Sequence, residues 1–231
     1  MTAKLILGIT GGIASGKSTV SSALVAEYSN RPYAQTENLS GPPRVVTLAV
    51  IDADKVGHGV YDSQESDCYK GLVRHFGPGI VNDSPGDGSI NRKALGSIVF
   101  SDPEEMKQLQ AIVWPAIASR LKELIDEKKA TDDVIVVEAA ILFEAGWDKD
   151  LAFDVIITTQ VEPAVARERL MTRNALNAEE ADKRISSQMS NQERASRSNV
   201  VIDNSGGPED LKDKISETWG NILAPILGVV A

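Results

Sequence analysis

The chain of 231 residues is 42% hydrophobic and 25% charged, a composition typical of a globular protein rather than a disordered or fibrous one. Its formal net charge of −9 makes nucleic acid a poor partner, and its single cysteine, Cys68, excludes an internal disulfide and any metal site built from several cysteines. No apolar run approaches the roughly 20 residues of a membrane helix, and the N-terminus lacks the pattern of a secretory leader, so we expect a cytoplasmic protein with no membrane partner.

A short apolar run, a glycine-rich stretch and a helical pattern follow one another at the start of the chain. Residues 4–10 are apolar almost without interruption, which predicts a strand that is covered on both faces. Residues 17–28 have apolar positions at helical spacing, directly after the glycines. Residues 30–44 are rich in Pro, Ser, Asn and Gln and show little periodicity, so we expect an exposed loop there.

A second strand and a long helical region come next. Residues 44–51 form an apolar, β-branched run that ends at Asp52-Ala53-Asp54, which predicts a strand with two acids at its carboxyl end. Between residues 55 and 130 we find no buried strand, and amphipathic stretches predict helices instead. Residues 103–129 have apolar side chains three and four positions apart, so they should form one long helix that could bend at Pro115.

The rest of the chain alternates between strands and helices. Strands are predicted at residues 132–138, 153–159 and 199–203, and helices at residues 164–174, 178–196 and 208–223. Strands that alternate with helices imply an α/β fold with a parallel sheet and right-handed crossovers.

The glycine-rich stretch matches a phosphate-binding pattern. Gly11-Gly12-Ile13-Ala14-Ser15-Gly16-Lys17-Ser18 fits G-x-x-x-x-G-K-[ST] without a gap, between a predicted strand and a predicted helix, and Thr19 follows. Gly11 and Gly16 permit backbone angles that a side chain would forbid, so successive N–H groups can turn inward around an anion. A turn that only joins a strand to a helix would not need all eight positions. The sequence therefore predicts a P-loop that binds a nucleotide, with contacts from residues 12–19.

Within this loop, Lys17 should bridge the β- and γ-phosphates of ATP, Ser18 should hold Mg²⁺, and Thr19 is placed for the α-phosphate. A P-loop alone does not distinguish kinases from GTPases and transporters. The N-K-x-D motif of GTPases is absent from the sequence, and Leu39-Ser40-Gly41 lacks the rest of the transporter signature. A kinase acting on a small molecule therefore fits best.

Acids follow two of the predicted strands, at the edge where ligands bind in open α/β sheets. Asp52 and Asp54 follow the second strand, and one of them could accept the proton of an acceptor hydroxyl group. Glu138 closes the third strand and is suited to a Mg²⁺-bound water, and Glu144 follows a short apolar turn. Each of these acids could instead serve in a turn or as a helix cap.

Arginines are concentrated between residues 164 and 198. They are Arg167, Arg169, Arg173, Arg184, Arg194 and Arg197. Most charge runs are solvated helix faces, and nearby acids could pair with several of these side chains. Because Arg169 and Arg173 are four positions apart and share a helix face, we expect the group to form a mobile lid that closes over ATP.

Taken in order, these motifs resemble the dephospho-CoA kinase family over nearly the whole chain. The stretches that carry the resemblance are residues 9–19, residues 51–54, Asn91-Arg92 with Leu95 and Phe100, residues 141–144, Arg169 with Arg173, Arg184-Ile185 with Gln188, and residues 201–204. The first stretch is shared with many kinases, but the ordered set is specific.

The resemblance implies a P-loop NTPase fold of three α/β/α layers with a five-stranded parallel sheet. Residues 1–54, 131–163 and 199–231 would form the nucleotide-binding core, residues 55–130 a helical insertion that binds the acceptor, and residues 164–198 a helical lid. The reaction would transfer the γ-phosphoryl group of ATP to the ribose 3′-hydroxyl of dephospho-CoA, with Mg²⁺, as the final step of coenzyme A synthesis.

The resemblance also implies roles for individual residues. The catalytic residues would be Asp54 as general base, together with Lys17 and the lid residue Arg169. The remaining roles are nucleotide binding for Arg173 and Asn204, metal binding for Ser18 and Glu138, and acceptor binding for Asp52, Arg92, Trp114, Leu142 and Glu144.

Three features depart from the family pattern. The loop at residues 30–44 is longer than a usual connection. Trp114 stands where the family usually has His, and Ala140 replaces a usual proline. Trp114 leaves open another small-molecule or nucleotide kinase of the same fold. A regulatory protein that binds nucleotide without transferring phosphate is disfavoured, because Lys17, Asp54 and the lid arginines are all present.

Overall fold

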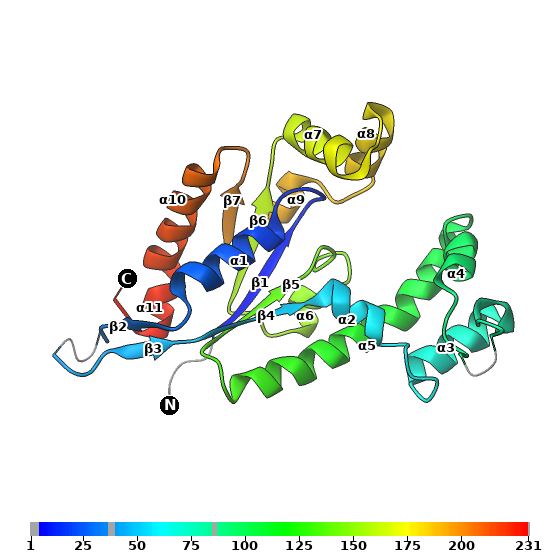
Figure 1. Cartoon of the computed structure of the whole chain (residues 1–231), viewed down its shortest axis with the longest axis horizontal. Helices are drawn as coiled ribbons and strands as arrows, with labels where there is room; N and C mark the ends of the chain where they lie inside the picture. The colour runs from blue at the N-terminus through cyan, green and yellow to red at the C-terminus, as the bar shows by residue number, and fades with distance from the viewer. Residues whose placement is uncertain (1–4, 37–39, 85–86, 231) are drawn as a thin grey trace. The chain divides into compact units, whose positions relative to one another are not determined.

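The structure is a computed structural model that describes residues 5–36, 40–84 and 87–230. Lys4, where the first strand was expected to begin, and Ala231 lie outside the described residues. The chain divides into two compact units, a larger one of residues 1–52 with 125–231 and a smaller one of residues 53–124 (Figure 1). Residues 164–198, for which a separate lid is predicted, belong to the larger unit.

A five-stranded parallel sheet forms the centre of the larger unit. Its strand order is β4-β5-β1-β6-β7 (Figure 1). The strands are β1 (Leu5–Gly11), β4 (Leu48–Asp52), β5 (Val134–Glu138), β6 (Val155–Gln160) and β7 (Val200–Asp203). All strands run the same way, so their carboxyl ends lie at one edge of the sheet. The predicted α/β fold with five parallel strands is confirmed.

Helices cover both faces of this sheet. The helices of the larger unit are α1 (Lys17–Tyr28), α6 (Trp147–Asp150), α7 (Pro163–Asn174), α8 (Ala178–Ser186), α9 (Asn191–Ser196), α10 (Pro208–Thr218) and α11 (Ala224–Leu227), of which α7 and α8 lie beyond the carboxyl ends of the strands (Figure 1). On one face, Leu5 and Leu7 of β1 join a buried core with residues of α1 and α10. On the opposite face, a Cβ atom at Gly8 would lie 3.0 Å from Leu142 Cδ1. Strand β1 is buried along its whole length, as its unbroken apolar sequence predicted.

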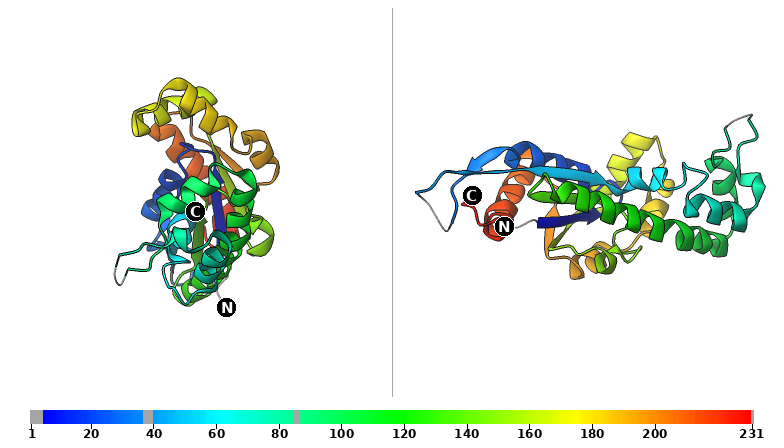
Figure 2. Two further views of the ribbon diagram at one scale, coloured as in Figure 1. Left: turned by 90° about the vertical axis from the view of Figure 1, so that its right-hand side faces the viewer. Right: turned by 90° about the horizontal axis from the view of Figure 1, so that it is seen from below.

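A small hairpin replaces part of the loop expected at residues 30–44. Strand β2 (Arg31–Tyr33) pairs antiparallel with β3 (Arg44–Val46), and the right-hand view of Figure 2 shows this hairpin from below. Tyr33 and Tyr28 of α1 both lie against Trp219, with ring centroids 5.6 and 4.3 Å away. The expectation of an irregular loop was therefore wrong at its ends, because aromatic packing stabilises strands too short to give a sequence pattern. Residues 37–39 lie outside the described residues.

The predicted strand at residues 44–51 is two strands rather than one. Thr47 separates β3 from β4, because its N–H donates to the side chain of Asp133 at 3.0 Å instead of joining a strand ladder. The predicted helix at residues 178–196 is likewise divided into α8 and α9. Ser190 caps the second of these by accepting a hydrogen bond from the N–H of Glu193. At the end of the chain, a π-helical turn, Trp219–Leu223, follows α10 where a continuous helix was expected.

The smaller unit is helical. It contains α2 (Ala53–Gly59), α3 (Asp67–Phe76), the 3₁₀ turn Pro78–Ile80, α4 (Arg92–Val99) and most of α5 (Pro103–Lys129), which continues into the larger unit. Its own core includes Leu72, Ile80 and Leu95. The single long helix expected at residues 103–129 is present, with Pro115 inside it.

Two further features concern the described part of the chain as a whole. Among its helices, none is long and apolar enough to cross a membrane. The same residues contain no group of three or more His, Cys, Asp or Glu side chains that could hold a metal ion.

A network around Asp133 joins the hairpin to the sheet and to the end of the chain. Arg44 Nη2 donates to Asp133 Oδ1 at 2.8 Å, and Arg44 Nη1 donates to the carbonyl oxygen of Leu227 at 2.6 Å. Both charged side chains are only 12 to 13% exposed. Burial raises the pKa of the Asp133 carboxyl, but the hydrogen bonds and charge from Arg44 and the Thr47 N–H outweigh burial and leave this pKa lowered.

We expect Asp133→Asn to lower the free energy of unfolding by roughly 1.5 to 3 kcal/mol at pH 7, since it removes charge-assisted hydrogen bonds. A pKa below its unfolded value of about 3.9 stabilises the fold above that pH, and this contribution is lost as pH falls through the folded pKa. Urea unfolding at pH 7 and below pH 4 should therefore show a difference from wild type that shrinks in acid. The exposed-site variant Asp213→Asn is the control, and a difference independent of pH would contradict the role of the charge.

Candidate active site

The P-loop lies at the carboxyl edge of the sheet, between β1 and α1. Gly11 ends β1, and Gly16 is the N-cap of α1 with a left-handed φ of 89°. A Cβ atom at Gly11 would lie 2.2 Å from the carbonyl oxygen of Thr159 on the neighbouring strand β6. Ser15 also contacts this residue, with 2.8 Å between the two hydroxyl oxygens. Strand β6 therefore determines how closely the loop can approach the sheet.

Asn204, which follows β7, holds the other end of the loop. Its Nδ2 atom donates to the carbonyl oxygen of Ser15 at 2.9 Å, and a Cβ atom at Gly16 would lie 2.1 Å from the same nitrogen. Asn204 is only 7% exposed. Asn204, which was expected to bind nucleotide, thus shapes the P-loop backbone through its buried side-chain amide group.

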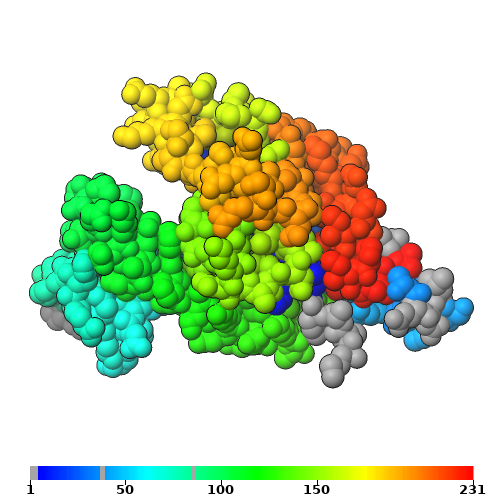
Figure 3. Space-filling view, turned by 180° about the vertical axis from the view of Figure 1, so that it is seen from behind, coloured from blue at the N-terminus to red at the C-terminus, as the bar shows by residue number. Residues whose placement is uncertain are grey.

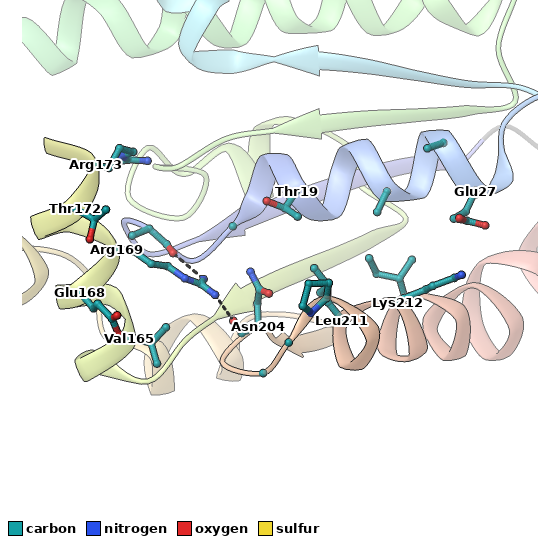
Figure 4. A pocket seen from close by; sticks show the side chains of 18 residues that line it. Thr19, Glu27, Val165, Glu168, Arg169, Thr172, Arg173, Asn204, Leu211 and Lys212 are labelled. Carbon is teal, nitrogen blue, oxygen red and sulfur yellow. Dashed lines mark hydrogen bonds between the residues drawn. The ribbon is translucent and has the colours of Figure 1, made fainter.

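Arg169 of α7 contacts the same part of the loop. Its Nη1 atom donates to the carbonyl oxygen of Ala14 at 3.2 Å, and its Nη2 atom to that of Asn204 at 2.9 Å (Figure 4). Ala14 itself has a left-handed φ of 61°, which is uncommon outside glycine. Arg173, one turn further along α7, is exposed and donates through Nε to Asn174 Oδ1 at 3.0 Å.

A cavity of about 930 Å³ adjoins the loop (Figure 4). It lies between α1, α7 and the segment that leads from Asn204 into α10. Gly16, Thr19, Arg169 and Arg173 line it near the loop, and apolar side chains such as Val165 and Leu211 line it farther away. An apolar cavity beside a phosphate-binding loop is suited to the base and sugar of a nucleotide.

Oxygen atoms from α1 and β5 form a cluster beside the loop. Ser18 Oγ donates to Glu138 Oε1 at 2.5 Å, and Ser21 Oγ donates to Glu138 Oε2 at 2.9 Å. Asp52, at the end of β4, is the register partner of Glu138 on β5. Lys17 Nζ donates to the carbonyl oxygen of Gly11 at 3.2 Å. Hydroxyl and carboxylate oxygens are ligands that Mg²⁺ prefers, so this donor set fits the metal expected here.

The residues of the smaller unit expected in the site occupy three separate helices. Asp54 lies in the first turn of α2, two residues after the end of β4. Arg92 begins α4, where its Nη2 atom donates to the carbonyl oxygen of His58 at 2.8 Å and its guanidinium lies 5.5 Å from the ring centre of Tyr61. Trp114 lies within α5 and is partly buried.

Two residues expected to bind the acceptor make contacts inside the larger unit. Leu142 is completely buried and packs beneath Gly8, so its side chain contributes to the core. Glu144 Oε1 accepts a hydrogen bond from Arg194 Nη2 at 2.7 Å, and the Arg194 side chain is 1% exposed. Figure 3 shows the face on which the segment after β5 and helix α9 lie side by side.

The arginine-rich segment divides into residues with different partners. Arg167 pairs with Asp182 and Arg197 with Asp148, whereas Arg169 contacts the P-loop. Several of these arginines thus pair with nearby acids, and the lid that closes over ATP stays a prediction.

Sequence reasoning did not assign a site role to Thr159 or to Gln188. Thr159 lies within the apolar strand β6 and carries no motif of its own. Gln188 Oε1 accepts a hydrogen bond from the N–H of Ile13 at 2.7 Å across 175 positions of sequence. Long-range contacts of this kind leave no pattern in a single sequence.

Comparison with known proteins gives consistent results. A family model described as dephospho-CoA kinase matches residues 44–210. The dephospho-CoA kinase of Geobacter sulfurreducens is 39% identical over 218 residues, which cover 93% of this chain and 96% of the relative. That of Symbiobacterium thermophilum is 35% identical over 215 residues, covering 93% of this chain and 80% of the relative.

Solved structures share the fold over almost the whole chain. The crystal structure of TT1252 from Thermus thermophilus has a TM-score of 0.69 at 28% identity and covers 95% of this chain and 98% of that chain. Dephospho-CoA kinase from Campylobacter jejuni has a TM-score of 0.55 at 22% identity, with coverage of 95% and 97%. The family model matches most of this chain, and the relatives named above are 35 to 39% identical to it over 93% of its length. The chain therefore belongs to the dephospho-CoA kinase family.

Proposed function

We propose that this protein transfers the γ-phosphoryl group of ATP to the ribose 3′-hydroxyl of dephospho-CoA, giving coenzyme A and ADP in the final step of coenzyme A synthesis. Membership of the dephospho-CoA kinase family supports the reaction. The observation that carries the proposal in this chain is the P-loop, whose backbone is held by Thr159 and Asn204 in a form that only glycine permits at two positions. The substrates would be small molecules in the cytoplasm.

The nucleotide would bind with its phosphates at the P-loop and its nucleoside in the adjoining cavity. The first turn of α1 begins at Lys17, so the N-terminal end of the helix dipole faces the loop and favours negative charge there. The cavity beside Gly16 and Thr19 has a volume of about 930 Å³, enough for an adenosine group. Arg169 and Arg173 on its wall would interact with the phosphates, as the resemblance implies.

Mg²⁺ would be held by Ser18 and Glu138, the hydroxyl directly and the carboxylate through an ordered water. When bound, the ion supplies positive charge against the phosphate oxygens. Mg²⁺ in kinases usually keeps several waters and takes only one or two protein ligands besides the phosphates, so a large cluster of acids is not required. Ser21 contributes by orienting the Glu138 carboxylate, to which it donates at 2.9 Å.

Asp54 would act as the general base for the acceptor hydroxyl. It follows β4 at the carboxyl edge of the sheet, where Asp52 and Glu138 end neighbouring strands. Proton transfer to a positioned carboxylate and the positive charge of Lys17 would together stabilise the transferring group. Asp52, Arg92 and Trp114 are proposed to contact the acceptor. Glu144 is proposed to do so through Oε2, because its Oε1 accepts from Arg194 whereas Oε2 is buried without a hydrogen-bond partner among the described residues.

With purified protein, ATP and Mg²⁺, we expect ADP release to rise strongly when dephospho-CoA is added. Coenzyme A should appear in equal amount, because each transfer consumes one ATP. Adenosine and AMP serve as competing acceptors in parallel reactions. Stimulation by one of these alone would indicate another small-molecule kinase with a pocket remodelled by Trp114, and no stimulation by any acceptor would indicate a nucleotide-binding regulator.

Lys17→Ala and Asp54→Asn should separate phosphate binding from base catalysis. Lys17→Ala should weaken ATP affinity about 10-fold or more and reduce turnover about 100-fold, because it removes positive charge from the phosphates. Asp54→Asn should leave the Kd of ATP within about threefold while reducing turnover about 100-fold, the size of a lost general base. Calorimetric titration with ATP and steady-state rates provide the two numbers.

Asp67→Asn is the matched control for the second variant, since Asp67 also occupies the first turn of a helix in the smaller unit. Its turnover should stay within about twofold of wild type. Equal losses of ATP affinity in Lys17→Ala and Asp54→Asn would show that Asp54 is not the base.

Glu138→Gln should raise the Mg²⁺ concentration needed for half-maximal activity by about 10-fold, because the side chain keeps its size but loses the charge that orders the metal-bound water. Rates measured across a Mg²⁺ series at saturating ATP test this expectation. Glu162→Gln, an exposed acid after β6, is the control. An unchanged Mg²⁺ dependence in Glu138→Gln would remove this residue from the metal site.

A further inference from the structure

A turn between α8 and α9 contacts the P-loop at Ile13, a residue that does not line the nucleotide cavity. Gln188, in this turn, accepts the N–H of Ile13 at 2.7 Å through its side-chain carbonyl oxygen. A Cβ atom at Gly12 would lie 3.7 Å from the same oxygen and 3.7 Å from Arg194 Nη1. Gln188 and Arg194 therefore lie directly against Gly12 and Ile13, whereas Arg169 and Asn204 hold the loop at Ala14 and Ser15.

The position of Gln188 is itself fixed by buried polar contacts. Arg194 Nη1 donates to the carbonyl oxygen of Met189, the residue next to Gln188, while Arg194 Nη2 pairs with Glu144. On the other side of the turn, Asn191 Nδ2 donates to the carbonyl oxygen of Val161 at 3.0 Å. The Arg194 side chain is 1% exposed and ion-paired with Glu144, so it has little conformational freedom and holds the turn in one place.

We infer that Gln188 is a positioning residue that keeps the P-loop ready to bind the phosphates of the nucleotide. A loop that is already ordered loses less conformational entropy when a ligand binds, which increases affinity without any direct contact to that ligand. Gln188 gives the Ile13 N–H a fixed partner, so the first half of the loop is ordered before nucleotide arrives. This inference rests on the proposed function for its ligand, ATP, but concerns binding rather than transfer.

Two other roles for Gln188 make different predictions. If Gln188 only supported packing, replacing it would lower the melting temperature and leave nucleotide affinity unchanged. If Gln188 acted in the transition state, replacing it would lower turnover at saturating ATP. Replacing a residue that positions the loop should weaken ATP and ADP binding to the same extent, because both nucleotides would bind the loop through their β-phosphates.

Gln188→Met tests the inference, since methionine keeps the length of the side chain and lacks the amide oxygen. We expect the Kd of both ATP and ADP to increase about fivefold to tenfold by calorimetry, the size of one hydrogen bond. Turnover at saturating ATP, the KM for dephospho-CoA and the melting temperature without nucleotide should stay close to wild type. Gln192→Met, the same change at an exposed position of α9, should leave the Kd unchanged.

A measurement on the wild-type protein gives an independent test. The amide hydrogen of Ile13 should exchange slowly with solvent in the absence of nucleotide, because it is bonded to Gln188. An unprotected Ile13 amide would overturn the inference, as would an unchanged Kd in Gln188→Met or an equal change in Gln192→Met. The calorimetric Kd values report nucleotide binding without phosphate transfer. A failure of the proposed reaction would instead appear in the ADP-release assay with dephospho-CoA.

Discussion

The P-loop has its shape because two residues distant in the sequence, one on β6 and one just after β7, leave no room for a side chain at Gly11 or at Gly16. A Cβ atom at these positions would lie 2.2 Å from Thr159 and 2.1 Å from Asn204. These close contacts hold the backbone against β6 and β7, so the start of α1 has a fixed direction. Ser18 and Ser21, three positions apart on one face of that helix, then both reach the carboxylate at the end of β5.

Much of this arrangement could be predicted from the sequence, because the features involved are local. The eight-residue loop, the apolar strands and the long helix each have a pattern within a short stretch of chain. The parallel order of strands follows from their alternation with helices, and it brings Asp52 and Glu138 to one edge, where they are register partners. The proposed metal-binding acid was therefore identified from its place at the end of a strand.

The features that could not be predicted depend on contacts between distant residues. The hairpin at β2 and β3 has only three residues in each strand and relies on Trp219 for its packing. Nothing near Arg194 in the sequence distinguishes it from the other arginines of its segment, yet it is buried because Glu144 lies opposite it. Leu142 belongs to a motif of the family, but its full burial makes it a packing residue.

The residues that shape the P-loop are made long after the loop itself during synthesis. Ser15 is separated by 144 positions from Thr159 and by 189 from Asn204. A nascent chain therefore contains the complete glycine-rich motif long before it contains the strands that hold the motif in place. Such long-range contacts form slowly, because a large loop must close before they can stabilise anything. The backbone of the loop consequently reaches the shape described above only after residues 159 and 204 have been made and packed against it.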